Sequence, residues 1–291
     1  MGESLIDLIK VLRDRTGAGL MDCKGALLAN DCDIEKATDW LREKGLAKAA
    51  KKADRIAAEG VASILIKDNK AAIVEVNSET DFVAKNEEFT SMVSTILETI
   101  IDSDVKSVED ALKLDCGEGT INDLIVAKTA KIGEKLSLRR FEVVTKSDTE
   151  SFGEYIHMGG KIAVLITVDG ANSEVAKDVA MHAAAMRPKY VNKDNVPSDE
   201  VEKERKVLKE QAMNEGKPEE IAAKMVEGRI RKFYEEICLE EQAFVKDNDK
   251  KVREYVKANG GVVKSMVRFE VGEGMEKREE NFAEEVAKQM K

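Results

Sequence analysis

The chain has 291 residues and a formal net charge of −10, and 36% of its residues are charged against 43% hydrophobic. This length allows two or three domains, and the composition is typical of a helix-rich protein with a sizeable core, not of a disordered chain. Nonspecific nucleic-acid binding needs Lys and Arg to neutralise phosphates, so the acidic balance counts against DNA or RNA as the main partner.

The first 45 residues predict three short helices, which together would form a small bundle. Ser4 and Asp7 have the spacing of a helix-capping box, and apolar residues follow at helical intervals. Asp33 can cap the third helix, and Gly45 is expected to end it. Residues 46–58 are rich in Ala and Lys and predict a solvated helical linker, with a phosphate-binding patch as the less favoured alternative.

The pattern then changes to one of mixed helices and strands. Residues 61–76 predict a β-hairpin, and the apolar spacing of residues 89–100 predicts a helix. Two further helix starts have the form Ser/Thr-x-x-Asp, at Ser107 and Thr120. Residues 136–144 then predict a strand, which completes a first α+β unit.

The order of hairpin, helix and final strand recurs later in the chain. Residues 155–168 predict a second hairpin, residues 175–186 a helix and residues 263–271 the last strand. The tetrapeptides Arg140–Val143 and Arg268–Val271 are identical. We interpret this recurrence as a core of two related α+β subdomains with antiparallel sheets.

A long helical segment interrupts the second unit. Residues 198–238 have a helical pattern that breaks near Gly216 and Pro218, as expected for an antiparallel helical hairpin. Its charged flanks leave two alternatives, a solvated arm or an arm that pairs with another molecule, including a second copy in a homodimer. Residues 275–290 predict an amphipathic helix that either folds back or docks on a partner.

These patterns predict an α+β protein of five parts. The expected parts are the bundle with its linker (1–55), the first core subdomain (56–145), the second core subdomain (146–197 and 239–272), the helical hairpin (198–238) and a C-terminal helical module (273–291).

The segment Thr80–Asn86 places a carboxylate beside a large aromatic ring where the first hairpin meets a helix. Its own residues favour a structural interpretation, in which Thr80 or Asp81 caps the helix and Phe82 packs beneath it. The alternative is that the turn holds these side chains out towards a partner.

Motifs of covalent chemistry are missing from the sequence. It has no P-loop, no His-Glu-x-x-His motif, no Gly-x-Ser-x-Gly motif and no dinucleotide-binding fingerprint. The two histidines favour structural roles, with His182 packed in a helix and His157 on the second hairpin. The residues therefore predict an interaction protein without a cofactor, and an enzyme is the least favoured hypothesis.

Neither metal binding nor membrane insertion is expected. The four cysteines form no Cys-x-x-Cys pair, which predicts reduced thiols and no zinc site. They are Cys23, Cys32, Cys116 and Cys238. The start of the sequence lacks the basic and then apolar pattern expected of a signal peptide, and no apolar run approaches the roughly 20 residues that span a bilayer. We therefore expect a cytoplasmic protein.

A series of short segments along the chain carries a resemblance to a known family. They are Leu12–Lys24, Thr80–Lys85, His157, Ala180–His182, Gly216–Pro218, Met225–Arg229 and Arg268–Gly274. These segments resemble the signatures of the bacterial elongation factor Ts family, and the similarity covers essentially the full length and is specific in order and spacing.

The resemblance implies a non-enzymatic translation factor that promotes guanine-nucleotide exchange on elongation factor Tu without itself binding nucleotide. It also implies a ubiquitin-associated-like N-terminal bundle ahead of the two-subdomain core. An adaptor for peptides or ubiquitin-like folds, built on that bundle, is the alternative function.

The resemblance further implies the site residues. Thr80, Asp81, Phe82 and Val83 would enter the GTPase near its Mg²⁺ site, with Phe82 as an apolar wedge and Asp81 holding displaced groups. His157 would be the family's core histidine. The bundle would contact the GTPase domain through Leu12, Arg13, Leu20 and Met21.

Overall fold

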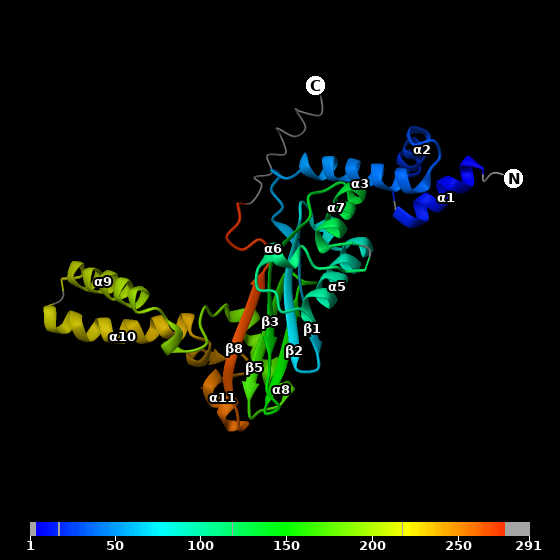
Figure 1. Cartoon of the computed structure of the whole chain (residues 1–291). Helices are drawn as coiled ribbons and strands as arrows, with labels where there is room; N and C mark the ends of the chain where they lie inside the picture. The colour runs from blue at the N-terminus through cyan, green and yellow to red at the C-terminus, as the bar shows by residue number, and fades with distance from the viewer. Residues whose placement is uncertain (1–3, 17, 118, 217, 277–291) are drawn as a thin grey trace. The chain divides into compact units, whose positions relative to one another are not determined.

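Residues 4–276, apart from 17, 118 and 217, are described by the computed structural model (Figure 1). They form a mixture of helices and three small antiparallel sheets, so the prediction of an α+β fold is confirmed. Among these described residues, no helix is both long and apolar enough to cross a membrane.

Internal contacts divide the chain into two units. One unit takes its described residues from 1–65, 74–142 and 270–291, and the other takes them from 66–73 and 143–269. The predicted division into five parts is finer than this and stays a prediction. The predicted C-terminal helix falls largely on 277–291, outside the described residues.

Three helices form the N-terminal bundle. They are α1 (Leu5–Thr16), α2 (Leu20–Ala29) and α3 (Ile34–Ala50). The side chain of Asp33 accepts a hydrogen bond from Lys36 N–H, so the predicted cap of α3 is confirmed. The prediction that Gly45 ends this helix is wrong, because the Ala-rich residues after it favour helix and extend α3 to Ala50.

The first unit combines helices with the larger part of a three-stranded sheet. The strands are β1 (Glu59–Lys67), β2 (Lys70–Ser78) and β3 (Ser137–Thr145), and β2 lies in the middle. The helices between β2 and β3 are α4 (Asp81–Ala84), α5 (Glu87–Ile101), α6 (Val108–Ala111) and α7 (Ile121–Ile132). The predicted starts are confirmed, since Ser107 and Thr120 cap α6 and α7 with their side chains.

The second unit has the same strand order. Its sheet contains β4 (Glu150–His157), β5 (Ile162–Asp169) and β8 (Val262–Glu270), again with the second hairpin strand in the middle. Its helices are α8 (Ser173–Met186) and α11 (Val252–Ala258), and a small sheet pairs β6 (Ala243–Phe244) with β7 (Asp247–Lys251). Helix α8 packs so closely on β4 that a Cβ at Gly153 would lie 2.1 Å from the backbone of Ala176.

The inserted segment forms two long helices that lie side by side (Figure 1). They are α9 (Ser198–Asn214) and α10 (Glu219–Ile237). Leu208, Val226 and Ile230 are buried together between them, which explains the apolar spacing seen in the sequence. Gly216 ends the first helix with a positive φ of 73°, and Pro218 precedes the second.

Candidate functional site

The turn after β2 exposes an aromatic ring. Phe82 is 80% exposed, the largest fraction among the large hydrophobic side chains that the structure describes. The expectation that this ring packs under the helix is therefore wrong. Helix α4 has a single turn, and its inward side is already taken by Val83 and Ala84, which are both buried.

Thr80 anchors this turn and does not cap its helix. Its backbone occupies the N-cap position, but its side chain makes no capping hydrogen bond. Instead, Thr80 Oγ1 donates to Glu134 Oε1 at 2.7 Å and Thr80 N–H donates to Glu134 Oε2 at 2.9 Å. Asp81 pairs with Lys85 one turn later, at 3.1 Å. The predicted cap by Thr80 is thus corrected to a bond with a distant segment.

The loop that supplies Glu134 is itself tied to the end of β2. Gly133 ends α7 with a left-handed φ of 92° and reverses the chain. Lys135 N–H then donates to Glu79 Oε1 at 2.6 Å, and the guanidinium of Arg55 reaches the same carboxylate at 3.2 Å. Lys135 Nζ also donates to the carbonyl of Arg55 at 2.9 Å, so Lys135, Glu79 and Arg55 are all joined to one another by hydrogen bonds.

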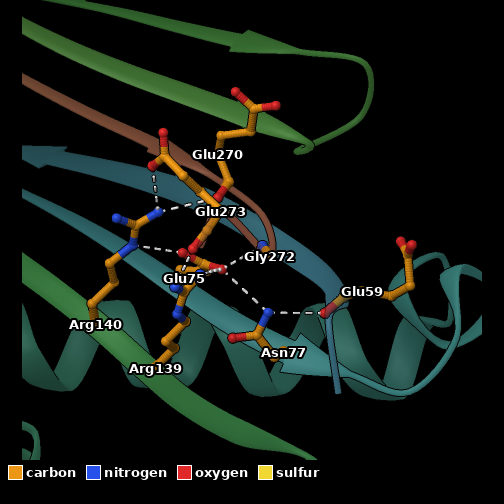
Figure 2. A network of polar contacts seen from close by, with 8 residues as sticks. All are labelled: Glu59, Glu75, Asn77, Arg139, Arg140, Glu270, Gly272 and Glu273. Atoms are coloured by element: carbon orange, nitrogen blue, oxygen red, sulfur yellow. Dashed lines mark hydrogen bonds and ion pairs between the residues drawn. The ribbon is translucent and has the colours of Figure 1, made fainter. Parts of the chain in front are cut away.

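A buried carboxylate lies on the strand that leads to this turn. Glu75 is fully buried on β2, and Figure 2 shows its carboxylate among Arg139, Arg140 and Gly272. Arg140 Nε donates at 2.6 Å, while Arg139 Nη1 and Gly272 N–H both donate at 2.9 Å. Burial alone would raise the pKa of Glu75, but the Gly272 N–H and the two guanidinium groups hold this pKa below its usual value.

His157 lies in the second unit, at the end of β4. Its ring is exposed and stacks on Tyr155, with 5.9 Å between the ring centroids. Tyr155 OH lies 3.4 Å from His157 Nδ1, and Met158 follows on the hairpin turn with 72% exposure. The hairpin therefore offers a polar ring and an apolar side chain to solvent.

His182 has a different environment, and its prediction as a packed histidine is confirmed. Its side chain is fully buried in α8. Nε2 lies 3.0 Å from Gln242 Oε1, and Nδ1 accepts a hydrogen bond from Val245 N–H at 3.2 Å. Burial lowers the pKa of this histidine. Both ring nitrogens are occupied in the packing of the second unit.

The bundle residues differ in what they can contact. Arg13 is exposed, Leu20 is 53% exposed and Met21 is 73% exposed, so they form an accessible surface at the start of α2 and the end of α1. Leu12 is fully buried between the helices of the bundle. It can act only by holding these helices together.

The part of the chain that the structure describes contains no group of three or more His, Cys, Asp or Glu side chains placed to hold a metal ion. The exposed apolar side chains described above, on the turn after β2, on the β4–β5 hairpin and on the bundle, instead suit contact with another protein.

A family model described as Elongation factor TS matches residues 79–273, which is more than half of the chain. The chain belongs to the elongation factor Ts family. Proteins of this family are translation elongation factors that promote nucleotide exchange on elongation factor Tu and have no covalent chemistry of their own. The match includes both the Thr80 turn and His157, whereas the bundle lies outside it.

Two features of the site were not found from the sequence. Glu134 is 54 residues from Thr80, and no local pattern joins them. Glu75 did leave a signal, because it is the one acidic residue inside the otherwise apolar run Ala71–Val76. A charge within a fully buried strand indicates a buried ion pair.

Proposed function

We propose that this chain promotes GDP release from elongation factor Tu by inserting Phe82 close to the Mg²⁺ site of the GTPase. The observation that carries the proposal is the 80% exposure of Phe82 on a turn whose base is fixed by hydrogen bonds. Transfer of an exposed apolar ring from water into an apolar cleft is favourable, and a fixed base limits the entropy lost on docking.

In this mechanism Phe82 separates two elements of the GTPase as a wedge. Asp81 supplies a carboxylate that holds the polar groups displaced from the Mg²⁺ site. Loss of Mg²⁺ coordination removes the main charge compensation of the bound diphosphate, so GDP leaves faster. Val83 stays buried in the protein and holds α4 against it, so that Phe82 keeps its position; the burial of Val83 supports this role.

Two further surfaces would add affinity. His157 and its hairpin would meet the GTPase from the second unit, and Arg13, Leu20 and Met21 would meet it from the bundle. A homodimer through the helical hairpin or the core stays a prediction, as does action in the cytoplasm. Family membership favours the exchange factor over the adaptor hypothesis.

Thermodynamic linkage sets the consequences of this mechanism. If the factor weakens GDP binding, GDP weakens binding of the factor by the same ratio. The factor must then bind the nucleotide-free GTPase better than the loaded one, and it speeds exchange in both directions. In this mechanism the chain makes and breaks no covalent bond, and we expect it to act without a cofactor of its own.

The direct test is the release of fluorescently labelled GDP from purified elongation factor Tu in the presence of excess unlabelled GDP. We expect release to accelerate with the concentration of the added chain and to saturate. An unchanged release rate at micromolar concentrations of a folded chain would rule out the proposal.

A further inference from the structure

The direction of Phe82 is set by a residue far away in the sequence. Helix α4 has four residues, too few to be stable alone. The ring of Phe82 is 80% exposed, so packing does little to fix it. Its orientation therefore follows from what holds the backbone of the turn. The buried Val83 and Ala84 hold its inner side, and Glu134 holds its first residue, Thr80.

We propose that Glu134 is a positioning residue for nucleotide exchange, which fixes the direction in which α4 presents Phe82 to the GTPase. This inference rests on the proposed function. Glu134 acts through Thr80, whose N–H and hydroxyl it binds with one oxygen each, at 2.9 and 2.7 Å. Two simultaneous hydrogen bonds to the two oxygens of one carboxylate define an orientation, which one hydrogen bond would not.

The support of Glu134 is rigid enough for this task. The loop that carries Glu134 turns at Gly133, where φ is 92°, and its next residue, Lys135, is bonded to both Glu79 and Arg55. Glu134 thus lies between the end of α7 and Lys135, which is hydrogen-bonded to the residues beside the end of β2. The two hydrogen bonds from Thr80 to Glu134 therefore join the end of α7 to the start of α4.

Phe82 can separate elements of the GTPase only from a defined orientation. Loss of the Glu134–Thr80 hydrogen bonds should therefore affect the maximal rate of GDP release more than the half-saturating concentration of the factor. In the proposed function, the contacts that bring the two proteins together would lie on several surfaces, and loss of Glu134 would leave the others in place. The step that separates elements of the GTPase depends on the alignment of Phe82. Loss of the two Glu134–Thr80 hydrogen bonds should therefore lower the maximal rate of GDP release and leave the half-saturating concentration of the factor nearly unchanged.

The test uses the full chain with four variants: Glu134→Ala, Phe82→Ala, the double variant and Glu88→Ala. Glu88 is the control, because its side chain accepts hydrogen bonds from Lys128 and Lys131 of α7 and, among the described residues, has no hydrogen bond to Thr80. GDP release from elongation factor Tu is measured over a range of factor concentrations, which gives both parameters for each variant.

We expect Glu134→Ala to lower the maximal rate by roughly fivefold to twentyfold, as for the loss of charge-assisted hydrogen bonds. Glu88→Ala should release GDP as fast as the unaltered chain. In the Phe82→Ala background, loss of Glu134 should change the rate by less than about twofold, because Glu134 acts through that ring.

The outcomes separate this inference from the function on which it rests. A normal rate for Glu134→Ala, with a slow Phe82→Ala, would overturn the positioning role and leave the wedge intact. Effects that multiply in the double variant would also overturn it. A normal rate for Phe82→Ala would contradict the proposed function itself. If Glu134→Ala does not fold, Thr80→Val removes the hydroxyl bond alone and is expected to show the same split between the two parameters.

Discussion

The backbone N–H of Gly272 donates to the buried carboxylate of Glu75 at 2.9 Å, although 197 residues separate the two. Arg140 holds the same carboxylate and also donates to the carbonyl of Glu270, at 3.1 Å. The strand that leads to the Thr80 turn and the chain that follows β8 are therefore joined at one ionised group (Figure 2).

Removing this charge should destabilise the first unit. In Glu75→Gln the two guanidinium groups lose their shared partner and a buried amide replaces a carboxylate. We expect a loss of about 3 kcal/mol, at the lower end for a broken buried pair because both arginines keep some exposure to water. Urea unfolding measures this loss. The control Glu88→Gln, at an ion pair whose carboxylate is more exposed, should lose under about 1 kcal/mol.

The same carboxylate predicts how stability depends on pH. The pKa of Glu75 is lowered in the folded chain from its usual value of 4.5, so the unfolded chain takes up the proton first as the pH falls. The contribution of Glu75 is full above this usual value and is lost as the pH falls through the lower folded pKa. Urea midpoints of the unaltered chain and of Glu75→Gln should therefore converge in acid. A gap that stays constant down to strongly acidic pH would contradict this account.

Gly272 should tolerate no side chain. Its φ is 74°, and a Cβ would lie 2.3 Å from the carbonyl oxygen of Ala58. Gly272→Ala should cost on the order of 2–4 kcal/mol, combining backbone strain with a steric clash. Gly274→Ala is the matched control, since its φ is 72° but nothing lies within 4 Å of its Cβ. It should cost about 1 kcal/mol from the backbone alone. Equal losses in the two variants would show that the clash is relieved.

The cysteines should differ in reactivity. Burial raises the pKa of the Cys238 thiol to about 11 and also raises that of Cys23. Cys32 is exposed. Because the thiolate is the reactive form, iodoacetamide at neutral pH should label Cys32 first and should label Cys238 only after unfolding. Mass spectrometry of the labelled peptides measures the order, and early labelling of Cys238 would contradict its burial.

Local patterns predicted the elements well because their causes are local. The Ser/Thr-x-x-Asp starts at Ser107 and Thr120 are capping interactions within one helical turn, and the sequence contains both partners. The prediction for Gly45 was wrong because the Ala-rich residues after it continue the helix. Gly45 is buried within α3, and a Cβ there would lie 3.7 Å from the Cβ of Ala130 in α7, a tertiary contact that no local rule contains.

At the candidate site, too, local sequence patterns could not predict the tertiary contacts. The sequence placed Thr80 and Phe82 at a strand-to-helix turn, which the structure contains. It could not show that Phe82 faces solvent, since that depends on which residues fill the space under α4. It also could not show that Glu134 takes the hydroxyl of Thr80 away from its capping role. The residues offered an outward-facing ring only as the less favoured alternative, and the family resemblance is what favoured it.

The most direct test of the wedge compares the unaltered chain with Phe82→Ala in two measurements. Because the ring is exposed, we expect the free energy of unfolding to change by less than about 0.5 kcal/mol. We expect GDP release from elongation factor Tu to slow by at least roughly tenfold, an energy of about 1.4 kcal/mol. Met213→Ala, at an exposed apolar residue of α9, should release GDP normally. Unchanged GDP release by a stably folded Phe82→Ala chain would contradict the account.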